Sequence, residues 1–237
     1  MMYDTICSML RKSGNIEHKY LKAGDSKKKA VIAITSNRGL AGGYNNNIVK
    51  LVTGAEGLTP ENAVIYAIGR KGKDSFVRKG YEIAEDYSEV INEPIYRDVA
   101  DVTAELLDAF GQNQIGEIYL AYTSFKNTVT HIPTLKKLLP VEAGDAGEKT
   151  DLVLMNYEPN EDQVLDSIIP KYMSSLIYGA LLEAVASENG ARMTAMDSAT
   201  NNAEEMIEEL GLAYNRARQG SITQELTEII AGANAIS

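Results

Sequence analysis

Residues 193–217 read MTAMDSATNNAEEMIEELGLAYNRA, and their apolar or small side chains recur at alternating steps of three and four. The repeat lasts for about three and a half heptads, a spacing that lets one helix pack along a seam against another in a left-handed supercoil. The seam consists of Met193, Met196, Thr200, Ala203, Ile207, Leu210, Tyr214 and Ala217. We therefore predict a coiled-coil helix that needs a partner.

The helical pattern extends well beyond the seam in both directions. No proline follows Pro170, and the sequence predicts one helix over residues 161–233, about 110 Å long at 1.5 Å per residue. After Ala217 the seam would continue at Ser221 and Gln224, which are polar. The apolar side chains shift instead to Ile222, Leu226, Ile229 and Ile230. This shift indicates a different partner surface, although an ordinary bundle helix with an irregular stripe is an alternative.

The glycines in the predicted helix include Gly190, Gly211 and Gly220. Each costs about 1 kcal/mol relative to alanine in a helix interior. We expect a close approach of another backbone at some of them.

The middle of the chain, residues 28–160, predicts an α/β domain with a largely parallel sheet. Short apolar runs that fit buried strands are Ala30–Thr35, Ala63–Gly69, Glu117–Tyr122 and Asp151–Tyr157. Helical spacing marks Tyr44–Ala55 and Asp98–Phe110 between them, and this strand–helix alternation is typical of α/β layers. Residues 123–140 fit an edge hairpin because they contain β-branched residues and two prolines.

Composition excludes several classes of function. The formal net charge is −10 in 237 residues, which argues against free nucleic acid as a partner. Cys7 is the only cysteine, and there are two histidines, so a disulfide within the chain, a thiolate metal cluster and a histidine-rich metal site are excluded. No apolar run approaches the ~20 residues of a membrane span.

Two glycine-containing turns are the candidate chemical sites. Residues 36–43 (SNRGLAGG) follow the first predicted strand at the position where doubly wound folds bind phosphate. The turn lacks the known nucleotide fingerprints, so we interpret it as a tight turn with Asn45–Asn47 capping the next helix. Residues 69–73 (GRKGK) could attract an anion, but a solvated turn is favoured. The acid pairs Glu204/Glu205 and Glu208/Glu209 are interpreted as a solvated helix face.

Three blocks of sequence resemble F-type ATP synthase gamma subunits. They are residues 187–196 (SENGARMTAM) with 214–219 (YNRARQ) and 222–229 (ITQELTEI), then residues 35–45 (TSNRGLAGGYN), and residues 68–72 (IGRKG). The blocks occur in the family's order, and the resemblance covers essentially the whole chain. It implies a Rossmann-like globular foot, residues 28–160, and a long C-terminal shaft helix, residues 161–237.

The resemblance also implies a function. The chain would be the central rotor stalk, which couples proton-driven rotation of the c-ring to conformational changes of the catalytic beta subunits. Its implied partners are the alpha and beta subunits, the epsilon subunit and the c-ring. It implies no catalytic residue, cofactor or metal in this chain. Its implied place is peripheral, on the cytoplasmic face of a bacterial plasma membrane, with the mitochondrial inner membrane as the alternative.

The contacts with the alpha/beta hexamer that the resemblance implies fall on the C-terminal helix. They are Arg192, Arg218, Gln219, Thr223, Glu225, Thr227 and Glu228. Residues 218–228 are also where the heptad seam gives way to polar side chains, which agrees with a change of partner.

The family has a further helical segment at the N-terminus, and residues 1–27 are interpreted as the remnant of that coiled-coil helix followed by a loop. The chain would then be truncated relative to the family. We expect the seam to be exposed, self-associating or frayed in the isolated chain.

Two other functions stay open at this point. A stand-alone nucleotide-binding α/β protein would bind nucleotide through residues 39–43, and a coiled-coil adaptor would bind some other partner. Nucleotide titration and co-purification with alpha and beta subunits separate the three.

Overall fold

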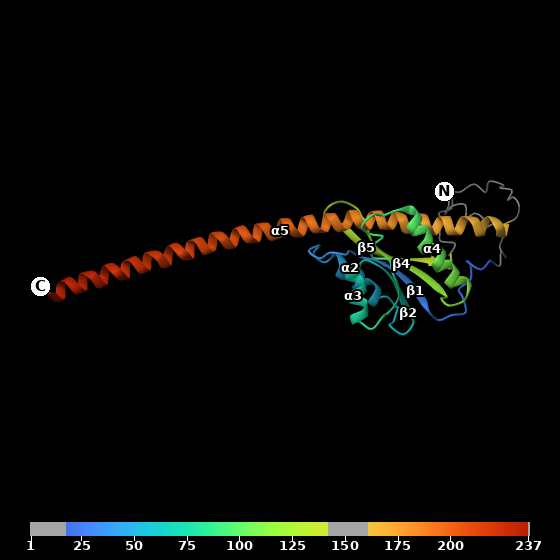
Figure 1. Ribbon diagram of the computed structural model, residues 1–237, viewed down its shortest axis with the longest axis horizontal. Coiled ribbons are helices and arrows are strands. Elements are labelled where there is room, and N and C mark those ends of the chain that lie inside the picture. The colour runs from blue at the N-terminus through green and yellow to red at the C-terminus, as the bar shows by residue number, and fades with distance from the viewer. Residues whose placement is uncertain (1–17, 142–160, 237) are drawn as a thin grey trace. The chain divides into compact units, whose positions relative to one another are not determined.

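The computed structural model describes residues 18–141 and 161–236 (Figure 1). The elements are β1 (Lys29–Ile34), α2 (Tyr44–Thr53), β2 (Ala63–Ile68), α3 (Arg70–Arg78), β3 (Glu82–Asp86), α4 (Tyr96–Gly111), β4 (Glu117–Phe125), β5 (His131–Leu139) and α5 (Glu161–Ile236). The chain divides into two compact units, of which the first ends at Arg192 and the second begins at Met193. This division differs from the predicted boundary at residue 160.

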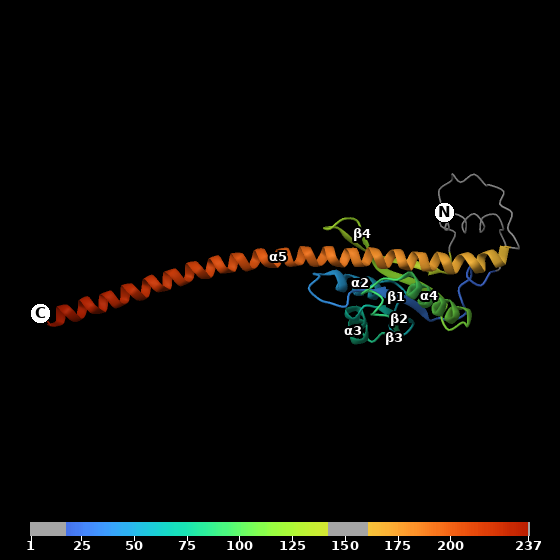
Figure 2. The same ribbon diagram turned by 45° about the horizontal axis from the view of Figure 1, so that its top comes forward.

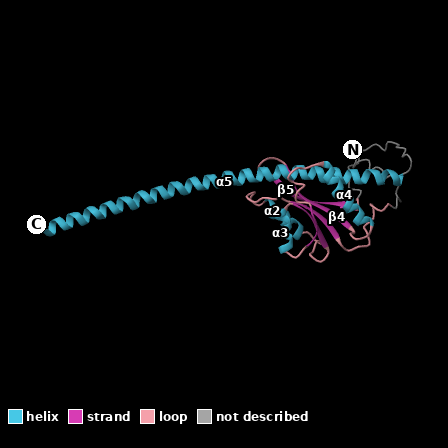
Figure 3. Cartoon of the chain, in the orientation of Figure 1, coloured by secondary structure: helices cyan, strands magenta, loops and turns pink. Residues whose placement is uncertain are grey.

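The first unit is an α/β unit built on a five-stranded sheet with the order β3-β2-β1-β4-β5. The strands are drawn in magenta in Figure 3. β1 pairs in parallel with both β2 and β4, and β2 pairs in parallel with β3. β5 is antiparallel to β4 and closes the sheet as an edge hairpin. The predicted α/β class, the three central strands and the hairpin are therefore confirmed.

Helices cover both faces of this sheet (Figure 2). Val31 and Ala33 of β1 pack with residues of α2 and α3 on one face. Ile32 and Ile34 point to the other face and pack with α4 and the first part of α5. Strands buried on both faces need apolar residues at every position, which explains their continuous apolar runs.

Two elements were missed by the sequence analysis. Residues 69–73, predicted as a solvated turn, contain the start of α3, a charged helix in which only Gly72 and Phe76 are buried. β3 has the sequence EIAED and no buried residue, because it lies at the edge of the sheet. The predicted strand Asp151–Tyr157, Cys7 and the N-terminal part of the predicted remnant helix lie outside the described residues.

The predicted cap of α2 by Asn45–Asn47 is wrong. Gly43 is the N-cap residue, and no side chain makes a cap hydrogen bond there. Asn45 instead accepts hydrogen bonds from the backbone nitrogen of Ser36 at 2.8 Å and from its hydroxyl at 3.0 Å. The Asn45 side chain therefore fixes the loop that follows β1 rather than the first turn of the helix.

The helix α5 is confirmed and includes Pro170 near its start. A helix of this length is expected to need neighbours from other polypeptides along all of it, but its first part does not. It buries a stripe in the α/β unit that consists of Leu165, Ile169, Tyr172, Met173, Ile177, Ala180, Leu181 and Ala184. In the described part of the chain, no helix is long and apolar enough to cross a membrane.

Polar contacts also fix α5 against the sheet and α2. The Tyr44 hydroxyl donates to Ala184 O at 3.0 Å, and the Ser187 hydroxyl donates to Thr123 O at 3.2 Å. A side chain at Gly190 would lie 2.8 Å from His131 Nε2, so this glycine allows the hairpin to approach the helix. Thr128 O would lie 3.1 Å from the same added Cβ, so the close approach of another backbone predicted for some of the helix glycines is confirmed at Gly190. A Cβ added at Gly211 or Gly220 would have no neighbour within 4 Å among the described residues.

Glu117 at the start of β4 joins three strands. Lys29 Nζ lies 2.9 Å from one of its carboxylate oxygens, and Lys137 Nζ lies 3.0 Å from the other. The Tyr119 hydroxyl donates to the same carboxylate at 3.1 Å. Burial raises the pKa of Glu117, but the hydrogen bonds from Lys29, Lys137 and Tyr119 outweigh burial and hold the pKa below its ordinary value.

We expect Glu117→Gln to lower the free energy of unfolding by up to about 1 kcal/mol at neutral pH, because water screens these half-buried ion pairs. A carboxylate whose pKa is lowered by folding stabilises the fold above its unfolded pKa, and this contribution is lost as the pH falls through the folded value. The difference from the parent chain should therefore stay constant near neutral pH and shrink as the pH falls below ~4. Urea denaturation at several pH values measures it, and a constant difference would contradict the assignment.

Candidate partner-binding surface

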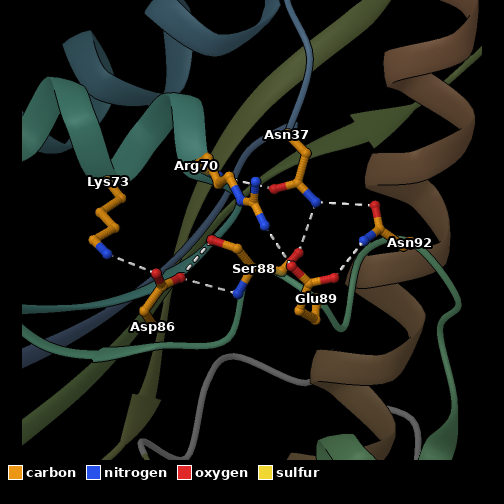
Figure 4. Close-up of polar contacts among 7 residues, drawn as sticks. All are labelled: Asn37, Arg70, Lys73, Asp86, Ser88, Glu89 and Asn92. Atoms are coloured by element: carbon orange, nitrogen blue, oxygen red, sulfur yellow. Dashed lines mark hydrogen bonds and ion pairs between the residues drawn. The ribbon is translucent and has the colours of Figure 1, made fainter.

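The carboxyl ends of β1, β2 and β3 carry polar side chains at the edge where open α/β folds bind ligands. Asn37 connects these segments, and its amide nitrogen donates to Ser88 O at 2.8 Å and to Asn92 Oδ1 at 2.9 Å (Figure 4). Glu89 accepts hydrogen bonds from Arg70 at 2.6 Å and from Asn92 at 3.0 Å. These side chains therefore bind one another and hold the loops together.

Asp86 at the end of β3 belongs to the same network. Lys73 Nζ lies 2.7 Å from its carboxylate, and the backbone nitrogen of Ser88 donates to it at 3.0 Å. The Ser88 hydroxyl donates to the carboxylate as well. Burial raises the pKa of Asp86, but these hydrogen bonds outweigh burial and hold the pKa below its ordinary value. Asp86 is thus a carboxylate that orders a loop.

The amino end of α3 has acceptors for its first four backbone amides. Such amides are what a helix offers to phosphate groups. The nitrogens of Arg70, Lys71, Gly72 and Lys73 donate to Asn37 Oδ1, Ser36 O, Thr35 Oγ1 and Gly69 O, at 3.0, 3.1, 3.0 and 3.3 Å. The protein therefore uses these groups itself, which argues against an anion site at residues 69–73.

Thr35 occupies the space that a ligand would need there. Gly69 has a φ of 114°, and a Cβ on it would lie 2.1 Å from Thr35 O. A Cβ on Gly72 would lie 2.5 Å from Thr35 Oγ1. The glycines thus serve contact between β1 and the turn into α3.

The loop after β1 presents one residue that the sequence analysis did not single out. Leu40 is 78% exposed and has a φ of 62°, in the left-handed region that leucine rarely adopts. An exposed apolar side chain in a strained loop is a candidate contact for another protein. The signal in the sequence was an apolar residue within a glycine-rich turn.

The second unit, from Met193 onward, carries the predicted seam. The eight side chains of the seam are all exposed, as is the acidic face at Glu204, Glu205, Glu208 and Glu209. The large apolar seam residues are 53–69% exposed and are Met193, Met196, Ile207, Leu210 and Tyr214. Ala203 and Ala217 lie on the same seam and are exposed too. An exposed apolar seam of this length marks a surface that another chain covers.

The predicted hexamer contacts differ in their surroundings. Arg192 forms an ion pair with Glu188 one turn earlier, at 2.6 Å, and is 21% exposed. Arg218 is exposed and has no ion-pair partner among residues 18–141 and 161–236. Arg218 is therefore free to bind a carboxylate of another protein, whereas Arg192 would have to share or exchange its partner.

The remaining predicted contacts lie on the exposed helix, and several of their side chains form hydrogen bonds with residues one turn away. The hydroxyl of Thr223 donates to Gln219 O, and the hydroxyl of Thr227 donates to Thr223 O, each at 2.8 Å. Gln224 donates to Glu228 at 3.1 Å. Glu225 is exposed. Within the described ranges, no group of three or more His, Cys, Asp or Glu side chains could hold a metal ion.

The fold of this chain is similar to that of chains in mitochondrial ATP synthases. Similar structures include a chain of the Euglena gracilis mitochondrial ATP synthase (OSCP/F1/c-ring), with a TM-score of 0.67 at 19% identity over 99% of this chain and 88% of that one. Another is a chain of the central stalk/c-ring of the Tetrahymena thermophila mitochondrial ATP synthase, with a TM-score of 0.60 at 21% identity over 83% and 86%.

The sequence itself matches the ATP synthase family over residues 1–236. It is 66% identical to the ATP synthase gamma chain of Lachnoclostridium phytofermentans, over 100% of this chain and 84% of the relative. It is 40% identical to the sodium ion specific gamma chain of Acetobacterium woodii, over 100% and 84%. The chain belongs to the ATP synthase gamma chain family.

Proposed function

We propose that this chain is the central rotor stalk of an F-type ATP synthase and couples rotation of a proton-driven c-ring to conformational changes of the beta subunits. The observation that carries the proposal is the exposed apolar seam of the second unit, in a chain 66% identical to an ATP synthase gamma chain. The shaft itself performs no catalysis, and its partners are alpha, beta, epsilon and the c-ring. The complex places it at the cytoplasmic face of a bacterial plasma membrane.

Coupling of this kind requires that the shaft bind the conformations of beta with different free energies. The surface of α5 beyond Arg192 can bind different conformations of beta differently because it is not uniform. Around the helix it has an apolar seam and an acidic face, and further along it has the segment 218–228 with many polar side chains. As the shaft turns, each beta subunit would meet these surfaces in succession.

The test is reconstitution of this chain with alpha and beta subunits. The proposal expects co-purification in one complex and ATP-driven rotation of a probe attached to the α/β unit. Failure to join the hexamer would contradict it. Nucleotide binding by the isolated chain would favour the stand-alone nucleotide-binding protein.

The coupling ion needs a separate experiment, because one relative is named as sodium ion specific. We expect ATP synthesis by vesicles that contain the complex to follow an imposed proton gradient without added sodium. Strict dependence on sodium would overturn the proton assignment and leave the rotor role unchanged.

We predict that Arg218→Ala slows ATP-driven rotation or weakens assembly by about tenfold, because a charge-assisted hydrogen bond to a beta carboxylate contributes about 1.5–3 kcal/mol. Arg192→Ala should have a smaller effect, since its guanidinium is already bonded to Glu188. Single-molecule rotation measures both, and Arg218→Lys is the control that keeps the charge. Unchanged rotation in both alanine variants would exclude these arginines as contacts.

A further inference from the structure

The turn that joins β4 to β5, residues 126–130, is attached to α5, and Figure 2 shows the hairpin beside this helix. We call these residues the hairpin turn. The backbone nitrogen of Phe125, directly before the turn, donates to Glu183 of α5 at 3.2 Å. Two helical turns further along α5, a Cβ on Gly190 would lie 3.1 Å from Thr128 O, so a glycine leaves room for the hairpin turn there. The hairpin turn is therefore held against the helix at two places.

The hairpin turn is also ordered from within. The Asn127 side chain accepts hydrogen bonds from the backbone nitrogens of Val129 at 3.0 Å and Thr130 at 2.7 Å. The backbone nitrogen of Lys126 donates to Thr130 O at 3.3 Å, which closes the turn. A turn that is fixed in this way presents its side chains in one arrangement, so little conformational entropy is lost when a partner binds it.

Two side chains of the hairpin turn are available to another protein. Val129 is 77% exposed, and Lys126 is exposed as well. Residues 124–132 contain no aspartate or glutamate, although the whole chain has a formal net charge of −10. The hairpin turn thus offers an apolar side chain and a cation in an otherwise acidic protein. Charge complementarity favours a partner surface on which an apolar site lies beside carboxylates.

The place of the hairpin turn on α5 indicates which protein covers it. The exposed seam begins at Met193, three residues after Gly190, and residues three apart are neighbours on the surface of a helix. A subunit that covers the start of the seam is thus within side-chain reach of the hairpin turn. Under the proposed function this subunit belongs to the hexamer, and it is beta because the shaft must bind the conformations of beta differently.

We infer that the hairpin turn binds a beta subunit, with Val129 in an apolar site and Lys126 beside carboxylates of beta. The inference rests on the proposed function and deepens it. The hexamer contacts assigned above lie on α5, whereas the hairpin turn joins two strands of the sheet. The sheet of the α/β unit would then contact beta directly instead of acting only through α5.

The first experiment identifies the subunit by photo-cross-linking. The photoreactive amino acid p-benzoylphenylalanine replaces Val129 in the complex of the full chain with alpha and beta subunits. Irradiation should join this chain to beta, and mass spectrometry identifies the product. The same replacement at Val77 is the control and should give no product with beta. Val77 is 54% exposed and lies on α3, which packs on the opposite face of the sheet from α5.

The second experiment measures what the contact contributes to assembly. Lys126→Glu with Val129→Asp should weaken assembly with alpha and beta by at least about tenfold, because it replaces the cation and the apolar side chain by two carboxylates. Lys79→Glu with Val77→Asp makes the same two changes at exposed residues near the end of α3 and should change assembly by less than about twofold. Thermal unfolding checks that both variants fold, and the cross-link, which adds no charge, decides if either does not.

The outcomes separate this inference from the rotor proposal. If the parent chain does not assemble with alpha and beta, both are overturned. If it assembles, the rotor proposal stands, and the inference is overturned by a cross-link from Val129 to alpha alone, by no cross-link, or by equal weakening in the two double variants. Cross-links to beta from both Val129 and Val77 would overturn it as well, because they would show general proximity instead of a site.

Discussion

Gly69→Ala is expected to lower the free energy of unfolding of the α/β unit by more than about 3 kcal/mol. Two costs add at this position. The backbone φ of 114° is one that residues with a Cβ rarely adopt, and the new methyl group would lie 2.1 Å from Thr35 O. Relief of that contact requires β1 or the turn into α3 to move, which would break the hydrogen bonds from Thr35 Oγ1 to Gly69 O and from Gly72 to Thr35 Oγ1.

Gly80→Ala is the matched control for Gly69→Ala. Gly80 also has a positive φ, 83°, but an added Cβ would have no neighbour within 4 Å among the described residues. It should therefore show the conformational cost alone, about 1–2 kcal/mol. Near-ultraviolet circular dichroism during urea denaturation measures both, because of the 13 tyrosines only Tyr214 lies beyond residue 192. Equal destabilisation by the two variants would show that contact with Thr35 is unimportant.

Leu210→Lys should weaken assembly with alpha and beta by about a hundredfold or more. Burial of a leucine contributes about 1.5–3 kcal/mol, and a lysine at the same position would also have to place its charge within the seam. In the isolated chain the side chain is 69% exposed, so the free energy of unfolding of the α/β unit should not change. Affinity for the hexamer of alpha and beta subunits gives the result.

Leu212→Lys provides the control for the seam. Leu212 lies two residues further along the same helix, is 60% exposed and stands off the heptad seam. The substitution makes the same change of side chain and charge, and we expect less than a threefold effect on assembly, because b, c and f positions of a coiled coil face water. Similar losses in the two variants would argue for a general effect of charge instead of a helix partner at the seam.

The central strands and the long helix could be predicted because single segments carry their signals. AVIAI and AVIYAI are apolar at every position, as strands covered on both faces must be. β3 has only Ile83 and Ala84 as apolar residues. It lies at the edge of the sheet and is only half buried, so its sequence contains no continuous apolar run that would predict a strand. α3 carries charge at most positions and is held by contact with Thr35 in a distant segment, which local spacing does not record.

The two parts of α5 show that an apolar stripe does not identify the surface that covers it. Both have apolar residues at steps of three and four, yet the stripe from Leu165 to Ala184 is buried in the chain's own α/β unit, and the seam from Met193 is exposed. Periodicity reports that a helix has an apolar side. Which chain covers that side depends on tertiary contacts, such as the hydrogen bond from Tyr44 to Ala184.

The way the base of α5 is fixed has a mechanical consequence. To roll about its own axis against the sheet by one residue, about 100°, the helix would have to bring its stripe from Leu165 to Ala184 into water and break the bonds from Tyr44 and Ser187. Each buried leucine or isoleucine adds about 1.5–3 kcal/mol to that barrier. A twisting force on the α/β unit is therefore passed into the helix as torsion instead of being lost by slippage at its base.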